Sequence, residues 1–456
     1  MSSQCTSSSG HELSSRTWRW VASVIGKNGS VPADLTIPRS PHRLPALVRA
    51  RLAVALAVGS MAGAASRVAG RGSGASIRGQ LMMRIAPDAL ANLLPGRTIA
   101  SVSGTNGKTT TTHLLAAAVK AAVGADRVVT NADGANLHYG IASALAVAPG
   151  RDVAILETDE RVVPDVVRLG RPAVLVLLNF SRDQMDRNHE IKSLGRGWRD
   201  ALSRAGADGP VVIANADDPL VTWAARSATK VVWVDTATSW TQDASLCPEC
   251  GTMLTRTNGR WACPTGDLVQ PEATWRVDGD AVVDPDGTRW ELGLKVPGAF
   301  NVSNGACALA AAAELGIDPE AAIRGMRTIT SPAGRYATAH FGSTTARLLL
   351  AKNPAGWAEA LPLTTSGTVV LAIDSAAADG RDVSWLWDVE YEQLAGRHVV
   401  ATGPRAQDLS VRLLYAEVEH SVVPDLAVAV AGHTDPVDVV ATYTPFQRLR
   451  KLGGLT

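Results

Sequence analysis

The sequence lacks an excess of charge of either sign. Its 44 lysines and arginines nearly cancel its 43 aspartates and glutamates over 456 residues. A chain balanced in this way has no large field to draw nucleic acid or an anionic membrane surface to it non-specifically. We therefore expect its partners to be recognised by local sites.

A long apolar run is also missing. The most apolar early stretch, residues 52–65, is bracketed by arginines and is shorter than the roughly 20 residues that cross a bilayer. The first 30 residues are rich in serine and do not show the charged start and apolar core of a signal peptide. We expect a soluble, cytoplasmic protein in which residues 52–65 form an amphipathic or core helix.

Cysteine is scarce, with five residues in the chain, and three of them, Cys247, Cys250 and Cys263, lie within seventeen residues. An odd, clustered set is more typical of a metal site than of a secreted disulfide framework. The other two are Cys5, near the start, and Cys307, in an alanine-rich run where a buried structural thiol is expected.

The length predicts two or three domains. Residues 1–45, rich in serine and proline, are expected to be a disordered extension. Residues 46–330 alternate apolar runs with helix-length segments, which predicts an α/β domain with a mostly parallel sheet. A Cys-containing, ribbon-like insert is expected at residues 243–292, and a second, Rossmann-like α/β domain at residues 331–456. The expected strands are residues 98–103, 153–156, 173–178, 211–214, 346–350, 368–373 and 399–401.

A glycine loop follows the first expected strand and opens a helix over residues 109–122. It consists of Gly104, Thr105, Asn106, Gly107, Lys108, Thr109 and Thr110. Backbone amides of such a loop can wrap a polyphosphate, while Lys108 neutralises it from a solvent-facing position and Thr109 ligates magnesium. The general signature would place a glycine where this chain has Val102. The remaining features nevertheless predict an ATP-binding loop rather than a polar turn.

The string from Gly104 to Thr110 resembles the ATP loop of the Mur ligase family, and further matches follow in the family's order. Glu157 matches the magnesium-binding glutamate after a strand. The segment from Asn215 to Pro219 resembles the N-x-D-D-P segment that lines the nucleotide pocket, so Asp217 would contact the nucleotide. Residues 300–304 resemble the asparagine motif, in which Asn301 or Asn304 would contact adenine. Arg335 would reach the phosphates or form an interdomain salt bridge.

Three segments resemble one branch of that family, the MurT ligases. Residues 247–264 resemble the MurT zinc ribbon, but Gly266 stands where its fourth cysteine would be. This leaves Asp267, a water, a distant ligand or a metal-free remnant open. Residues 179–187 resemble the loop near the substrate, and residues 352–357 and 378–388 resemble the C-terminal domain.

The resemblance implies ATP-dependent amidation of the α-carboxyl of D-glutamate in the lipid II stem peptide, through an acyl phosphate, at the cytoplasmic membrane face. A GatD-type glutaminase subunit would supply ammonia within a heterodimer. Lys108 and Glu157 would serve the ligase chemistry with ATP and Mg²⁺, with structural Zn²⁺ left open. Asp382 would complete the partner's Cys-His pair, with Asp379 and Asp388 as alternatives and a capping role equally open.

Two other functions remain compatible with these residues. One is a Mur-type or folylpolyglutamate-type ligase that joins an amino acid without a glutaminase. The other is a nucleotide-binding regulator that has lost catalysis. The intact Lys108, Thr109 and Glu157 argue against the second, because a decayed site should lose such residues first.

Overall fold

The computed structural model describes residues 45–68, 75–131, 135–182, 191–237, 242–330, 336–376 and 378–455. Cys5, Arg335, residues 183–187 of the loop near the substrate, and the expected extension save Pro45 lie outside them. The described residues belong to one compact unit, Arg39–Thr456.

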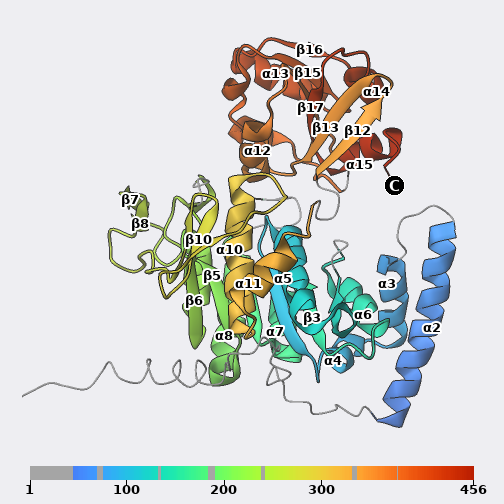
Figure 1. Cartoon of the computed structure of the whole chain (residues 1–456), viewed down its shortest axis with the longest axis vertical. Coiled ribbons are helices and arrows are strands. Elements are labelled where there is room, and N and C mark those ends of the chain that lie inside the picture. The colour runs from blue at the N-terminus through green and yellow to red at the C-terminus, as the bar shows by residue number, and fades with distance from the viewer. Residues whose placement is uncertain are drawn as a thin grey trace, which may run out of the picture. The chain divides into compact units, whose positions relative to one another are not determined.

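The first α/β domain is built on a nine-stranded sheet with the order β11-β10-β9-β6-β5-β4-β1-β3-β2 (Figure 1). Strands from β2 across to β9 pair in parallel, and β10 and β11 are antiparallel additions at the edge. The strands are β1 (Thr98–Ser103), β2 (Val128–Thr130), β3 (Val153–Glu157), β4 (Val174–Leu177), β5 (Val211–Asn215), β6 (Lys230–Asp235), β9 (Trp275–Asp278), β10 (Ala281–Val283) and β11 (Arg289–Glu291).

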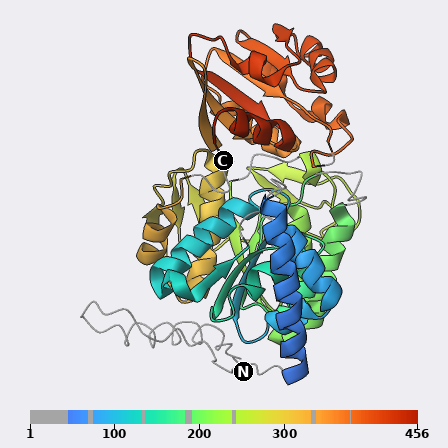
Figure 2. The same ribbon diagram turned by 90° about the vertical axis from the view of Figure 1, so that its right-hand side faces the viewer.

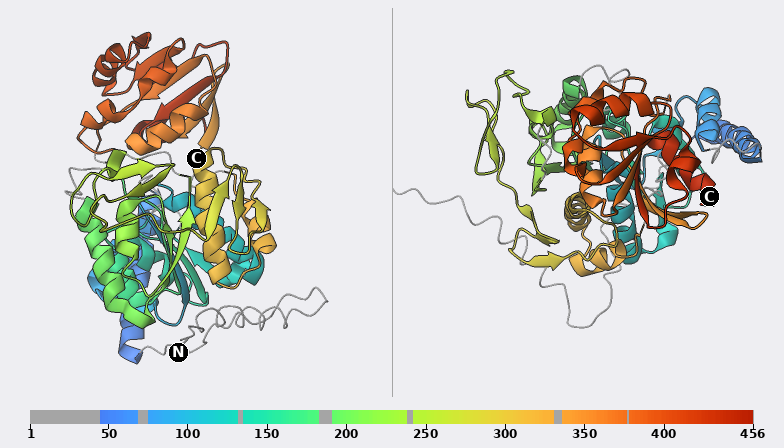
Figure 3. Two further views of the ribbon diagram at one scale, coloured as in Figure 1. Left: turned by 90° about the vertical axis from the view of Figure 1, so that its left-hand side faces the viewer. Right: turned by 90° about the horizontal axis from the view of Figure 1, so that it is seen from above.

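Helices cover both faces of this sheet, which is why its central strands are continuous apolar runs. On one face α5, α10 and α11 pack together, and on the other α6, α7, α8 and α9 pack against the strands (Figures 1 and 3). The helices are α2 (Ala46–Val68), α3 (Ala75–Ile85), α4 (Ala89–Leu93), α5 (Lys108–Val123), α6 (His138–Ala146), α7 (Val163–Gly170), α8 (Ile191–Ala205), α9 (Pro219–Ala225), α10 (Ala299–Glu314) and α11 (Pro319–Met326), with short 3-10 turns η1 (Ala125–Arg127), η2 (Gly206–Asp208) and η3 (Gln242–Ala244).

Only the first half of the expected insert forms a sheet of its own. The hairpin β7 (Thr255–Thr257) and β8 (Arg260–Ala262) makes a separate two-stranded sheet. The later strands β9 to β11 instead extend the main sheet, because β9 pairs in parallel with β6.

The second α/β domain has a six-stranded sheet with the order β12-β13-β17-β14-β15-β16, parallel except for β12. Its strands are β12 (Tyr336–Phe341), β13 (Thr344–Leu350), β14 (Thr368–Ala372), β15 (His398–Thr402), β16 (His420–Val422) and β17 (Val437–Ala441). Its helices are α12 (Pro354–Ala360), η5 (Leu361–Leu363), η6 (Ser384–Asp388), η7 (Tyr391–Leu394), α13 (Ala406–Tyr415), α14 (Leu426–Val430) and α15 (Tyr443–Leu452). Separate cores lie on the two faces of the sheet.

The early apolar helix is longer than the sequence indicated. Helix α2 has 23 residues and includes the arginines that were expected to bracket it. Its segment Ala46–Ser66 is, within the described part of the chain, the one helix long and apolar enough by composition to cross a membrane. The expectation that this stretch is too short to span a bilayer was therefore wrong.

Candidate active site

The glycine loop joins β1 to α5, and its two glycines hold backbone conformations that side chains resist. Gly104 has φ +139° and Gly107 has φ +84°. A Cβ atom on Gly104 would lie 2.9 Å from the backbone nitrogen of Asn179, and one on Gly107 would lie 2.3 Å from Oδ1 of Asn304. Glycine at both positions is thus required by left-handed geometry and by close neighbours.

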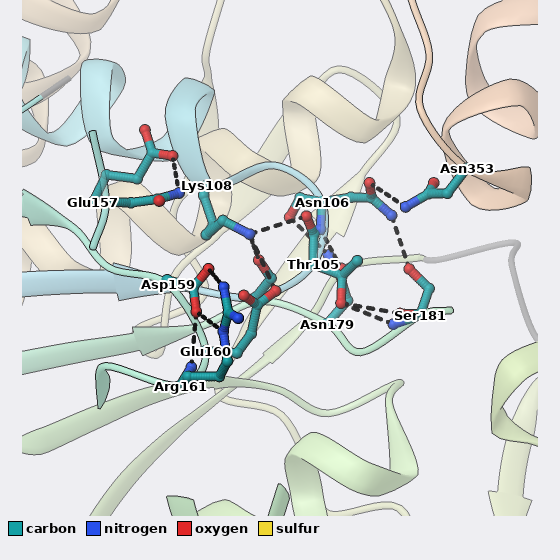
Figure 4. Close-up of polar contacts among 12 residues, drawn as sticks. Thr105, Asn106, Lys108, Glu157, Asp159, Glu160, Arg161, Asn179, Ser181 and Asn353 are labelled. Carbon is teal, nitrogen blue, oxygen red and sulfur yellow. Dashed lines mark hydrogen bonds and ion pairs between the residues drawn. The ribbon is translucent and has the colours of Figure 1, made fainter. Parts of the chain in front are cut away.

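Residues after β4 hold this loop from the other side (Figure 4). The Thr105 amide donates to the carbonyl of Asn179 at 2.9 Å, and the Asn106 amide donates to the Asn179 side chain at 2.8 Å. The Asn106 side chain donates to Ser181 Oγ at 2.9 Å. The segment that resembles the loop near the substrate therefore begins as a support for the phosphate loop.

Lys108 is paired inside the protein, so the expectation that it faces solvent was wrong. Its Nζ lies 3.1 Å from Oε1 of Glu160, and the two side chains are only 12% and 11% exposed. Nζ also donates to the carbonyls of Gly104 and Thr105. Burial favours the neutral amine, but the carboxylates of Glu160, Glu157 and Asp159 outweigh it and raise the pKa of Lys108. The lysine thus enters the site as a cation.

Glu157 lies at the end of β3 and is buried. Its Oε1 accepts a hydrogen bond from Asn136 at 3.0 Å, whereas its Oε2 is buried without a hydrogen-bond partner among the described residues. A buried carboxylate oxygen without a donor is costly unless a cation or water meets it. Glu157 and Thr109 line the same cavity, so the residues present fit a magnesium ion, which prefers such oxygen ligands.

The segment from Asn215 to Pro219 shapes the next part of the cavity. The Asp217 carboxylate accepts hydrogen bonds from the amide and hydroxyl of Thr236, at 2.9 and 2.8 Å, and from Gln270 at 2.9 Å. Asp218 caps α9 by accepting from two backbone amides, and its other oxygen accepts from the Phe180 amide at 2.7 Å. Burial raises the pKa of Asp218 to about 6 despite these three donors.

Of the two candidate asparagines on α10, the structure brings only Asn304 to the cavity wall. Asn301 is fully buried and donates to the carbonyl of Pro297 at 2.5 Å and to Tyr336 at 3.3 Å. It also accepts from the Asn304 side chain at 3.1 Å. Asn301 thus lies behind the cavity wall and orients the side chain of Asn304, which lines it.

These parts enclose one cavity of about 990 Å³. Its lining includes Thr105, Asn106, Gly107, Lys108, Thr109, Thr110, Glu157, Asp217 and Asn304. Residues of the second α/β domain also line it, and Asn353 donates to Asn106 Oδ1 at 3.2 Å (Figure 4). A volume of this size accommodates a nucleotide together with part of a second substrate.

Three residues of this site were not predicted individually from the sequence: Glu160, and Asn179 and Asn353, which were named only within longer segments. Glu160 stands three residues after Glu157, and Asn353 stands in one of the segments that resemble MurT. The role of each residue depends on a contact with a residue distant in the chain, which the sequence alone does not show.

The cysteine cluster is complete with Asp267 as its fourth member. One ligand atom from each of Cys247, Cys250, Cys263 and Asp267 lies within 4.8 Å of all the others. The Sγ atoms of Cys250 and Cys263 are 3.4 Å apart, and Cys263 Sγ lies 3.9 Å from Asp267 Oδ2. A hydrogen bond from Thr265 lowers the pKa of Cys263 to about 7. Three thiols and a carboxylate in this arrangement fit a tetrahedral metal ion.

The cysteine cluster is connected to the nucleotide cavity by two side chains. Trp261, buried in β8, donates to the carbonyl of Ala216 at 3.1 Å, and Gln270 donates to Asp217. Cys247 and Cys263 share one hydrophobic core with Trp198 of α8. The hairpin is thus packed onto the domain at the pocket wall.

The three candidate aspartates of the second domain lie in different surroundings. Asp379 is buried and accepts from the Thr444 amide at 2.8 Å, with its Oδ2 lacking a hydrogen-bond partner in the described chain. Asp388 pairs with Arg182 at 3.2 Å. Asp382 is exposed and accepts from the Ser384 amide at 2.8 Å, which lowers its pKa. Of the three, Asp382 is the one open to a partner protein, although its side chain also holds the turn that leads into η6.

Two protein-family models match the sequence. The Mur ligase middle domain matches residues 102–312, and the MurT ligase C-terminal domain matches residues 350–446.

Solved structures share the fold. A pseudomurein peptide ligase type C from Methanothermus fervidus has a TM-score of 0.62 at 18% identity, covering 80% of each chain. The UDP-N-acetylmuramoylalanyl-D-glutamyl-2,6-diaminopimelate–D-alanyl-D-alanyl ligase from Acinetobacter baumannii has a TM-score of 0.58 at 14% identity, covering 81% of this chain and 78% of its own.

Curated relatives match along most of the chain. The lipid II isoglutaminyl synthase subunit MurT of Staphylococcus aureus (strain N315) is 30% identical over 397 residues, covering 81% of this chain and 89% of the relative. The same subunit of Streptococcus pneumoniae is 28% identical over 372 residues, covering 75% and 82%. Because the identity extends over both α/β domains, the chain belongs to the MurT family of Mur-type ligases.

Proposed function

We propose that the chain is the ligase subunit of a lipid II isoglutaminyl synthase. In this reaction the α-carboxyl of D-glutamate in the lipid II stem peptide becomes an amide at the expense of ATP, with ammonia from a GatD-type glutaminase partner, at the cytoplasmic membrane face. The observation that carries the proposal is the 30% identity, along 81% of the chain, to a subunit of that name. The intact phosphate loop beside Glu157 supports an active enzyme rather than a regulator.

The ligase step follows from the cavity wall. The loop amides and Lys108 hold the triphosphate and balance its charge as the γ-phosphoryl group moves to a carboxylate oxygen of the substrate. This forms an acyl phosphate and releases ADP. The lone pair of ammonia then attacks the acyl carbon, a C–N bond forms, the nitrogen loses one proton, and inorganic phosphate leaves with the former carboxylate oxygen. A magnesium ion held by Thr109 and Glu157 would add charge stabilisation.

We assign further nucleotide contacts, beyond those of the loop and Lys108 to the triphosphate, to Asp217 and Asn304. A phosphate contact is proposed for Arg335. Cys247, Cys250, Cys263 and Asp267 are proposed to hold a structural zinc ion, since all four ligand positions of a closed site are then filled. Asp382 is proposed to complete the glutaminase site of the partner by orienting its histidine. Its exposure supports this role.

The decisive experiment is amidation of purified lipid II with ATP, followed by mass spectrometry of the stem peptide. Ammonium chloride should suffice for the chain alone, whereas glutamine should work only after the cognate glutaminase subunit is added. If neither nitrogen source works but a free amino acid is ligated, the chain is another kind of Mur-type ligase. If ATP binds without any substrate-dependent hydrolysis, it is a regulator.

A further inference from the structure

Helix α2 lies at an edge of the first domain and is packed on one side only (Figure 2). It contacts α3, which in turn contacts α6. The approach to α3 is close, because a Cβ atom on Gly59 would lie 2.6 Å from the carbonyl of Arg78. Arg51 also donates to the carbonyl of Ile85 at 2.7 Å. The helix is therefore fixed to the domain along its inner face.

The outer face of α2 is apolar and uncovered by any described residue. Leu47, Val54 and Met61 are 86%, 57% and 66% exposed. From position 53 to position 65 the exposed residues are Ala53, Val54, Ala57, Met61 and Ala65. Only 22% of the most apolar window of this helix is buried, whereas the core helix of a soluble domain would be mostly buried. This face needs a partner that is itself apolar.

The sequence around α2 is also strongly basic. Residues 35–87 contain eight arginines and no aspartate or glutamate, although the whole chain has a net charge of only +1. The rest of the chain is therefore net acidic, and positive charge is concentrated in this one segment. Arg49 and Arg51 are exposed at the start of the helix. The near-zero net charge of the whole chain does not reveal this local excess of positive charge.

An apolar helix face flanked by arginines is complementary to one kind of surface, a bilayer with anionic headgroups. Its acyl boundary accepts the apolar residues while its headgroups pair with the cations. We propose that the hairpin of α2 and α3 docks the chain on an anionic membrane, with α2 lying in the plane of the interface. The inner face of α2 stays on α3, so the helix does not span the bilayer. The proposal does not depend on the reaction assigned above.

Vesicle flotation of the full chain, without nucleotide or lipid II, tests this docking. Vesicles of phosphatidylcholine with 30% phosphatidylglycerol, a composition of about one anionic lipid in three, are compared with pure phosphatidylcholine. Val54→Asp and Met61→Asp place a charge on the apolar face, and Arg49→Ala removes an exposed cation at the start of the helix. Val428→Asp is the matched control, because Val428 on α14 is 63% exposed, close to Val54.

The chain and the Val428→Asp control should float with anionic vesicles and stay behind with neutral ones. Val54→Asp and Met61→Asp should lose binding at least tenfold, and the loss in Arg49→Ala should be largest at low salt. Equal binding of Val54→Asp and wild type, or no binding at all, overturns the proposal. Resistance to a carbonate wash at alkaline pH would replace it with a spanning helix. Because no substrate is present, these outcomes do not depend on whether amidation occurs.

Discussion

At the scale of single residues, the ion pair of Lys108 and Glu160 is the central charged contact of the phosphate loop. The Lys108 cation, which we propose contacts the nucleotide, has a carboxylate partner 3.1 Å away, and both side chains are largely buried. Removing one member of a buried ion pair leaves the other without compensation. We therefore expect both catalysis and folding to depend on Lys108.

Lys108→Ala should abolish ATP-dependent turnover, by at least about 10²-fold, because the loop loses its counter-charge to the phosphates. It should also lower the free energy of unfolding by about 3 kcal/mol, since Glu160 is left unpaired. Adding Glu160→Gln should recover most of that stability but no activity. The control is Lys120→Ala, near the end of the same helix. Activity assays and urea unfolding check these outcomes, and undiminished turnover would remove the phosphate-loop assignment.

Asp218 makes a separate prediction about pH. Its pKa is about 6 in the folded chain against 3.8 for an ordinary aspartate. The folded state then binds the proton more tightly, so this group's contribution to stability is complete below pH 4 and is lost as pH rises through 6. At about 1.4 kcal/mol per pKa unit, the loss approaches about 3 kcal/mol.

The free energy of unfolding of Asp218→Asn should lack this dependence, because an amide does not titrate. Loss of the acceptor for the Phe180 amide lowers the free energy of unfolding of the variant by an amount that does not change with pH. The measurement is the difference between wild type and variant in urea unfolding from pH 4 to 8. Parallel curves across that range would mean that the Asp218 pKa is not raised.

At the scale of elements, the β7–β8 hairpin joins a candidate metal site to the nucleotide pocket. We expect one zinc ion per chain, bound at least tenfold more weakly in Asp267→Asn and retained in Asp267→Cys. Asp280→Asn, at an exposed aspartate in the turn between β9 and β10, is the control. Metal analysis after dialysis against a chelator distinguishes these variants. Full zinc occupancy in Asp267→Asn would assign the fourth ligand elsewhere.

Removal of the metal should also weaken ATP binding several-fold. Trp261 of β8 contacts Ala216, which precedes the cavity-lining Asp217, and Gln270, which follows the hairpin, contacts Asp217 itself. A loosened hairpin would no longer fix these two residues. Calorimetric titration of ATP into the chain before and after chelation, with zinc added back, provides the measurement. Unchanged affinity would mean that the hairpin stabilises only itself.

The sequence predicted those elements best whose signals are local. β1 has the bounds that its apolar run indicated, and the helix after the loop begins one residue earlier, at Lys108. The parallel sheet and the resemblance to Mur-type ligases are confirmed. The bounds of α2 were wrong because arginines were taken as its limits, although their long side chains are readily placed inside a helix.

Features that depend on contacts between distant residues could not be predicted in the same way. The ion pair of Lys108 joins the start of α5 to a residue 52 positions later. The addition of β9 to β11 to the main sheet depends on the pairing of β9 with β6. From the sequence, Asp267 was one of several candidates for the fourth metal ligand, and Asn304 was one of two for the adenine contact. Only their positions in the fold distinguish them from the other candidates.

At the scale of the whole molecule, the proposed ligase site and the proposed support of a glutaminase partner would lie in different parts of the chain. Asp382→Asn should leave amidation with ammonium chloride unchanged, because Asp382 does not line the cavity. Amidation with glutamine and the partner should fall by about 10² or more, as expected when a histidine loses its orienting carboxylate. Asp435→Asn, an exposed aspartate of the same domain, is the control. Equal loss with both nitrogen sources would make Asp382 a structural residue.

The exposed face of α2 also bears on how a substrate is encountered. A chain held against a bilayer shares a layer only nanometres thick with any molecule anchored in that bilayer. Its search becomes lateral diffusion, and the concentration it experiences is set by the number of molecules per area rather than per volume. Weak affinity for the head of such a substrate would then be sufficient, because the surface itself keeps the two together between encounters.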